Sequence, residues 1–194
     1  LGRRVTVVES PFCTDISGMD NTLYNEKLLG KKYFLFFGTL NFLKGIHVIG
    51  QAIIDIFERY PDFYFVFQGR DSKLSWKGQE LTGKELLKMF AGKYAERIIF
   101  LLPISEKKQV YGVVSHAELV VLPSRVDNLP NTCIEAMALG KVVIGTRGAS
   151  FEQLITDGYN GWLIERDNPS SLLEKMDQAM RMTEEEKVLF GERA

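Results

Sequence analysis

The chain has 194 residues, of which 45% are hydrophobic and 25% charged, and its formal net charge is −1 at pH 7. This length allows one α/β domain with a substantial core, and the composition is that of a soluble globular protein. A nearly neutral chain has no electrostatic attraction for a polyanion, which argues against nucleic acid as a partner.

The few cysteines and histidines exclude several kinds of site. Cys13 and Cys133 are far apart and form neither a disulfide framework nor a zinc-ligand spacing, and the two histidines are isolated. The longest apolar runs, YFLFFG and RIIFLLP, are much shorter than a membrane-spanning helix. The opening LGRRVTVVES lacks both an initiator methionine and the long apolar stretch of a secretion signal. We therefore expect a cytoplasmic protein without a metal site or a transmembrane segment, and a sequence cut from a longer protein.

Short apolar runs alternate with helical patterns along the chain, which is typical of βα units in a parallel sheet. The core strands are apolar on both faces, as a sheet covered by helices on both sides requires. Strands are expected to begin near Val5, Tyr33, Phe63, Ile98, Glu118, Lys141 and Gly161. Helices are expected over residues 47–59, 84–94, 106–115, 132–139, 151–156 and 170–182.

Helix caps and irregular stretches complete this outline. Thr183 and Glu186 have the spacing of a capping box at the start of a further helix, and Ser150 and Gln153 have the same spacing. Residues 9–32 and the long polar segment 68–83 show little periodicity. Both stretches are expected to be irregular, and long loops of this kind often carry function.

The loop over residues 38–45 is a candidate phosphate site. Ligands of an open parallel sheet bind beyond the carboxyl ends of the strands, near helix N-termini. Gly38 allows a ligand to approach the backbone, and Lys44 supplies a positive charge. The loop lacks the Gly-Lys-Ser/Thr of a P-loop. An ordinary turn with a solvated lysine is the alternative interpretation.

The segment DNLPNTCIEAMALGK, residues 127–141, places Asp127 and Glu135 on either side of a helix start. The helix is expected to begin near residues 130–132 and to end at Gly140, which can take the left-handed conformation. A helix N-terminus attracts anions, so two acids there favour ligand hydroxyl groups, which sugars and riboses carry. Alternatively, Glu135 only forms a capping box with Thr132, and Asp127 is only a turn residue.

Together these motifs resemble the C-terminal half of the retaining family-4 glycosyltransferases of GT-B fold, from about Val5 to the chain end. The family's Gly-Arg-Leu…Lys-Gly loop is matched by Gly38, Leu40, Lys44 and Gly45. Its signature of an acid, seven other residues and a Glu, followed by EAMA.G, is matched by Asp127, Glu135 and residues 135–140. Two later elements are matched by Gly148, Glu152 and residues 157–163.

The resemblance implies a Rossmann-like, doubly wound parallel sheet. Residues 1–32 are then an interdomain connection and entry strand, and residues 33–194 a nucleotide-sugar-binding domain. The N-terminal acceptor domain of the GT-B fold is expected to be missing. The acceptor, whether glycan, lipid or small molecule, and any peripheral membrane contact are assigned to that missing domain.

The resemblance also implies roles for the matched residues. Glu135 binds the ribose hydroxyls, Lys44 binds the diphosphate, and Asp127, the one residue assigned to catalysis, contacts the donor sugar. The amides of residues 131–133 bind phosphate or sugar, and the backbone at Ile104 meets the base. The full donor-binding set is Gly38, Thr39, Lys44, Gly69, Arg70, Ile104, Leu129, Pro130, Asn131, Thr132, Cys133 and Glu135.

The sequence departs from the family pattern at two positions. Thr39 stands where the family has arginine, and Asp127 where it usually has glutamate. Arg70, Arg125 and Arg147 are the candidates to replace the missing cation.

The implied function is transfer of a sugar, with retention, from a nucleotide-sugar such as a UDP- or GDP-sugar. Neither cofactor nor metal is expected, because the helix dipole and cations stabilise the leaving diphosphate. The isolated chain is expected to bind the donor and to transfer no sugar. A GT-B epimerase or phosphorylase, or a non-catalytic sugar-nucleotide-binding module, are the alternatives.

Overall fold

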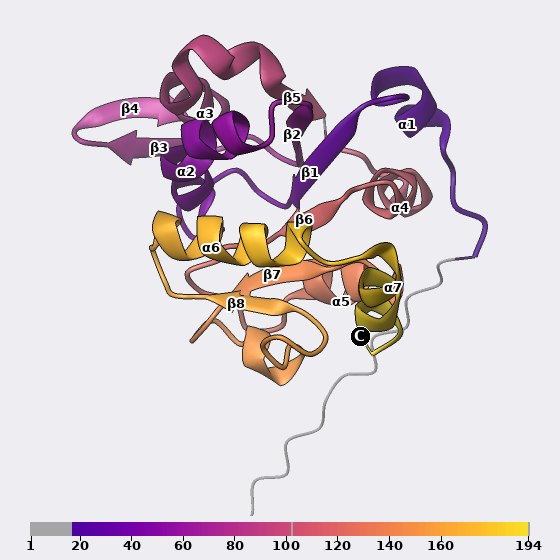
Figure 1. The fold of residues 1–194 in the computed structure, drawn as a ribbon. Coiled ribbons are helices and arrows are strands. Elements are labelled where there is room, and N and C mark those ends of the chain that lie inside the picture. The colour runs from indigo at the N-terminus through magenta and orange to yellow at the C-terminus, as the bar shows by residue number, and fades with distance from the viewer. Residues whose placement is uncertain (1–16, 102, 194) are drawn as a thin grey trace, which may run out of the picture.

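Six parallel strands form the central sheet of the computed structural model, which describes residues 17–101 and 103–193 (Figure 1). The strand order is β5-β2-β1-β6-β7-β8, so the chain first winds outward from β1 in one direction and then from β6 in the other. This doubly wound order confirms the predicted fold class and places the topological switch point between β1 and β6. The strands are β1 (Lys32–Phe37), β2 (Phe63–Gln68), β5 (Ile98–Leu101), β6 (Leu119–Val121), β7 (Val143–Thr146) and β8 (Trp162–Ile164).

Helices cover both faces of the sheet and enclose two apolar cores. Phe34 and Phe36 of β1 point into one core, which includes side chains of α2, α3 and α6, whereas Leu35 points into the other, with α4 and α5. Strands buried on both faces explain why the apolar runs of the sequence are continuous. The α-helices are α1 (Thr22–Lys27), α2 (Ile46–Arg59), α3 (Gly83–Ala91), α4 (Lys107–Ser115), α5 (Asn131–Ala138), α6 (Pro169–Met180) and α7 (Glu184–Glu192).

The polar segment 68–83 is not the irregular loop that was expected. It contains a β-hairpin of β3 (Lys73–Trp76) and β4 (Gln79–Thr82), which extends from one side of the molecule (Figure 1). Lys77 and Gly78 both have positive φ, as a two-residue hairpin turn requires. Packing of Trp76 against Phe42 and Phe90 supplies apolar burial that the alternating polar residues conceal in the sequence. Likewise, the stretch 9–32 includes the helix α1.

Two further local expectations have opposite outcomes. The helix expected over residues 151–156 is a single 3₁₀ turn, η2 (Phe151–Gln153), and the capping box of Ser150 is wrong because that residue is left-handed and its side chain makes no cap. The Glu152 carboxylate instead accepts a hydrogen bond from the Gly148 amide. At α7, the capping box of Thr183 and Glu186 is confirmed.

Some expectations have no structural test. The strand near Val5 and Cys13 lie outside the described residues. Within the described part of the chain, no helix is long and apolar enough to cross a membrane.

Candidate functional site

Two loops meet at the carboxyl ends of β1 and β6. The Arg125 amide donates a hydrogen bond to the Leu43 carbonyl at 2.8 Å. Gly45 has φ +73°, and a Cβ atom there would lie 1.8 Å from the Pro123 carbonyl oxygen. Only glycine fits so close an approach in this conformation. The switch point therefore holds the loop that carries Lys44 against the loop that carries Asp127.

Lys44 and Asp127 contact each other directly. The Nζ of Lys44 lies 2.5 Å from Oδ2 of Asp127, and the two side chains are 34% and 11% exposed. The Lys44 amide is held by the side chain of Asn41 at 2.9 Å. Lys44 is thus an ion-paired residue of the site, not the solvated lysine of the alternative interpretation.

Glu135 does not cap its own helix. The N-cap of α5 is Pro130, and the structure shows no side-chain hydrogen bond at that cap, so the predicted capping box of Thr132 and Glu135 is wrong. Glu135 is only 9% exposed, and its Oε1 accepts a hydrogen bond from Nζ of Lys107 at 3.2 Å. Lys107 begins α4, and its side chain is 67% exposed. The hydrogen bond and the charge of Glu135 raise the pKa of Lys107.

A cavity of about 310 Å³ lies between the ends of β1 and β2, the loop after β5, and the helices α4 and α5. The predicted donor-binding residues that line it are Gly38, Thr39, Gly69, Arg70, Ile104, Thr132 and Glu135. Gly69 has φ +143°, and a Cβ atom there would lie 2.0 Å from the Gly38 carbonyl oxygen, so the glycine pair brings two strand ends together.

Sequence reasoning missed three polar residues of the lining, Gln68, Lys107 and Tyr111. The position of Lys107 in the sequence could have revealed its role. It stands in the first turn of a helix, where the dipole favours acidic residues, directly after a predicted ligand-side loop. A cation in that place calls for an anionic partner, and here the partner is Glu135.

The other predicted residues, Lys44, Asp127, Leu129, Pro130, Asn131 and Cys133, are outside the cavity lining. The Cys133 thiol is buried 3.5 Å from the Met137 sulfur, and burial raises its pKa to about 12, so it is a neutral packing group. The amides of Asn131 and Cys133 donate to the carbonyls of Leu129 and Pro130. The loop itself therefore already satisfies two of the three amides assigned to the donor.

Of the three arginines that were candidates to replace the missing cation, Arg70 is the one that lines the cavity. Within the described residues, no carboxylate lies at ion-pair distance from it. Arg125 and Arg147 are each paired with carboxylates. Arg70 and Lys107 thus place positive charge in the lining of the cavity that also contains the buried carboxylate of Glu135, a combination suited to a ligand with both anionic and hydroxyl groups.

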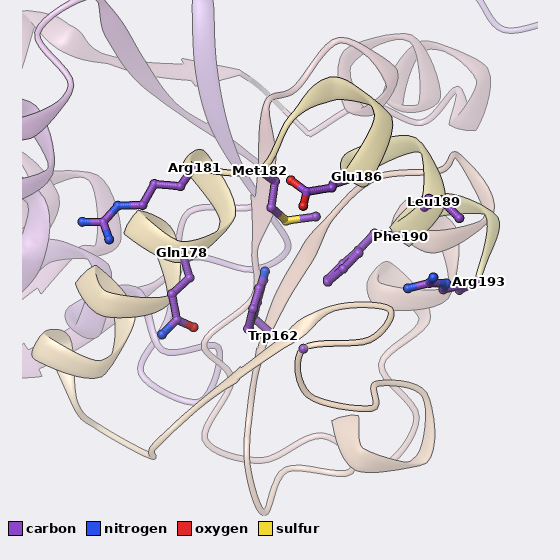
Figure 2. Close-up of a pocket in the computed structure, with 9 residues that line it drawn as sticks. Trp162, Gln178, Arg181, Met182, Glu186, Leu189, Phe190 and Arg193 are labelled. Carbon is purple, nitrogen blue, oxygen red and sulfur yellow. The ribbon is translucent and has the colours of Figure 1, made fainter.

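A second pocket, of about 500 Å³, lies between α6, α7 and the start of β8 (Figure 2). It opens at the amino end of β8, on the opposite edge of the sheet from the switch point. The rings of Trp162 and Phe190 face each other with centroids 5.7 Å apart, and the Arg181 side chain extends away from them (Figure 2). This groove has an aromatic floor, and its polar lining residues are Gln178, Arg181, Glu186 and Arg193.

The family model described as "Glycosyl transferases group 1" matches residues 24–194. The chain belongs to this glycosyltransferase family. An uncharacterized glycosyltransferase of Methanocaldococcus jannaschii is 32% identical over 167 residues, which are 86% of this chain and 43% of that protein. A D-inositol 3-phosphate glycosyltransferase of Corynebacterium urealyticum is 26% identical, over 78% of this chain and 35% of its own length. The chain spans less than half the length of these curated relatives.

Solved structures of glycosyltransferases share the fold. The C-terminal domain of a glycosyl transferase group 1 family protein from Francisella tularensis aligns with a TM-score of 0.74 and 22% identity, over 87% of this chain and 85% of that one. An Anabaena protein solved in complex with UDP and glucose aligns with a TM-score of 0.68 and 17% identity, over 88% of this chain and 44% of that one. The architecture is therefore that of the C-terminal half of a GT-B fold.

Proposed function

We propose that the chain binds a nucleotide-diphosphate sugar at the switch point, and that the longer protein transfers the sugar to an acceptor with retention of configuration. The observation that carries the proposal is Glu135, a buried carboxylate on the cavity wall that has no role in capping its own helix. A buried charge is costly unless it is paired, and a surface lysine is its counterion here. Family membership favours the hydroxyl groups of a ribose as the partner that replaces this lysine at Glu135.

The charges around the cavity support an assignment of the donor's parts. Glu135 accepts hydrogen bonds from the ribose hydroxyls, while Arg70 and Lys44 face the diphosphate. Asp127, bonded to Lys44, lies where the donor sugar leaves the diphosphate, and the backbone near Ile104 meets the base. Each assignment matches the ligand chemistry to the charge of the side chain, since cations bind phosphate oxygens and carboxylates accept from hydroxyl groups.

The chemistry of transfer needs stabilisation of the diphosphate as it leaves. We assign this to Arg70, Lys44 and the N-terminus of α5, whose positive charges and dipole stabilise developing negative charge without a metal. The acceptor hydroxyl attacks on the face from which the diphosphate departs, which retains the configuration. The acceptor itself, and a cytoplasmic location with peripheral membrane contact, belong to the same proposal and concern the longer protein.

Thermal unfolding of this chain with UDP, GDP or ADP tests the proposal. A nucleotide present at about 100 times its dissociation constant adds roughly 2.7 kcal/mol to the free energy of unfolding. We expect at least one of the three to stabilise the chain, and the corresponding nucleoside to stabilise it less. The absence of stabilisation by all three at millimolar concentration contradicts the proposal. Binding without sugar transfer by the longer protein would favour a non-catalytic binding module.

A further inference from the structure

Asp167 has an unusual backbone conformation for its residue type. It lies in the loop between β8 and α6, directly before the N-cap Asn168, with φ +53°. Left-handed geometry is uncommon for residues other than glycine, although aspartate tolerates it better than most. A glycine would satisfy the backbone here, so the aspartate side chain needs an explanation of its own.

The Asp167 carboxylate connects two other elements. Its Oδ2 lies 3.0 Å from Nε of Arg125 in an ion pair, and its Oδ1 accepts a hydrogen bond from Nε2 of His47 at 3.0 Å. Arg125 comes from the loop after β6, and His47 comes from the first turn of α2. We call these three residues the Asp167 bridge.

His47 is a neutral member of the Asp167 bridge. Its ring is buried beside Phe42, and this burial lowers its pKa. A neutral ring that donates from Nε2 leaves Nδ1 as a bare acceptor. Nδ1 is indeed buried without a hydrogen-bond partner in the described structure. The charge of Asp167 is therefore balanced by Arg125, and His47 fixes the orientation of its carboxylate.

The Asp167 bridge joins the two loops of the candidate site. Arg125 is two residues before Asp127, and His47 is three residues after Lys44. The loops already contact each other through the Arg125 amide and the Leu43 carbonyl. The carboxylate of Asp167 contacts both segments, so neither can move far without breaking the ion pair to Arg125 or the hydrogen bond from His47.

We propose that Asp167 is a positioning residue, which holds the Lys44 and Asp127 loops together and so strengthens the binding of a nucleoside diphosphate between them. This inference rests on the proposed function for its ligand, but not for the mechanical link between the loops. It also assigns Arg125 to the support of the site, not to contact with the phosphates.

Asp167→Gly is the decisive variant, because glycine accepts the observed φ and removes only the side chain. We expect the Arg125 amide to exchange its hydrogen faster in the ligand-free chain. We also expect the dissociation constant for UDP or GDP, whichever binds wild type, to rise about three- to tenfold, which lies in the lower part of the range of coupling between residues in contact. Nucleoside binding should change less. Lys77→Gly is the matched control, because it relieves the same backbone conformation in the hairpin turn at a residue that is not part of the Asp167 bridge.

Two further variants separate the bridge from a general loss of stability. Asp167→Asn keeps the shape and the left-handed preference and removes the charge, so it should weaken nucleotide binding to an intermediate extent. Arg125→Ala should reproduce Asp167→Gly, and the double variant should be no worse than either single one. Tighter nucleotide binding by Asp167→Gly would mean that the released Arg125 binds phosphate, and it overturns the inference. Unchanged hydrogen exchange of the Arg125 amide in Asp167→Gly also overturns the inference, whether or not wild type binds a nucleotide. Failure of wild type to bind any nucleotide contradicts the proposed function, and with it the role of Asp167 in binding.

Discussion

The two cation–carboxylate pairs of the candidate site differ in the exposure of their lysines. Lys44 is largely covered, and a short contact holds it to Asp127 between two connected loops. Lys107 extends into solvent from the start of α4 and reaches Glu135 by a longer contact. Solvent screens the exposed Lys107, so Glu135 can exchange this lysine for ligand hydroxyls, which then satisfy the buried carboxylate in its place. Lys44 and Asp127, in contrast, act as one preformed unit.

The largest effect should come from removing the exchangeable carboxylate. Glu135→Gln keeps the size of the side chain but removes its charge. Hydrogen bonds to charged groups contribute roughly 1.5–3 kcal/mol, so nucleoside diphosphate affinity should fall by about one to two orders of magnitude. Isothermal titration calorimetry with UDP and GDP measures this change.

A ligand without ribose hydroxyls is the control for Glu135→Gln. A 2′,3′-dideoxy nucleotide should bind wild type poorly and should hardly distinguish it from the variant. Because Glu135 does not cap α5, the variant should also unfold at a temperature near that of wild type. Unchanged affinity for the nucleotides that bind wild type would contradict the ribose role.

Lys44→Ala should have the next largest effect. Loss of a partly exposed cation beside the diphosphate should weaken nucleoside diphosphate binding about tenfold, while nucleoside binding stays nearly constant. Calorimetry on the two ligands gives the ratio directly. Equal losses of affinity for the nucleoside diphosphate and the nucleoside would show that Lys44 supports the loop and does not contact phosphate. In that case the loss would come from Asp127, which the variant leaves without its partner.

Asp127→Asn should affect the binding of two ligands to different extents. It removes an anion beside the phosphates and releases Lys44, so a nucleoside diphosphate without sugar should bind about two- to fivefold more tightly. The corresponding nucleotide-sugar should lose part of that gain, because Asp127 is assigned to the sugar. Competition between the two ligands in one titration series measures the difference. Equal gains for both ligands would remove Asp127 from the sugar contact.

The sequence predicted the sheet well because each buried strand is a continuous apolar run. The prediction was poorest in segments 9–32 and 68–83, where polar residues conceal short elements. Trp76 in the hairpin is stabilised by contacts with residues distant in the chain, which no local pattern reveals. Similarly, Phe151 begins only a 3₁₀ turn, and Ser150 before it is left-handed and makes no side-chain cap.

The sequence identified many residues of the candidate site but did not reveal how they contact one another. Spacing and family resemblance pointed to Asp127, Lys44 and Glu135, but gave no sign that the first two are bonded to each other. Thr132 and Glu135 had the spacing of a capping box, yet the N-cap is Pro130, two residues before Thr132, and the capping box does not form. Asp167 was not considered at all, since its two partners are 42 and 120 residues away in the sequence.

The smallest effect should come from Lys107→Ala, which tests the exposed lysine of the Lys107–Glu135 pair. If Lys107 only pairs with Glu135 until a ligand displaces it, its removal should leave nucleotide affinity within about twofold of wild type, because solvent screens this exposed lysine. Any difference should also shrink as salt is raised from low to physiological concentration, since the lysine is screened by solvent ions. Lys108→Ala, at the next position of α4, is a matched control for the loss of one positive charge. If Lys107→Ala lowered nucleotide affinity tenfold or more and Lys108→Ala left it unchanged, Lys107 would be a donor-binding residue. Lys44 and Lys107 would then have similar functions.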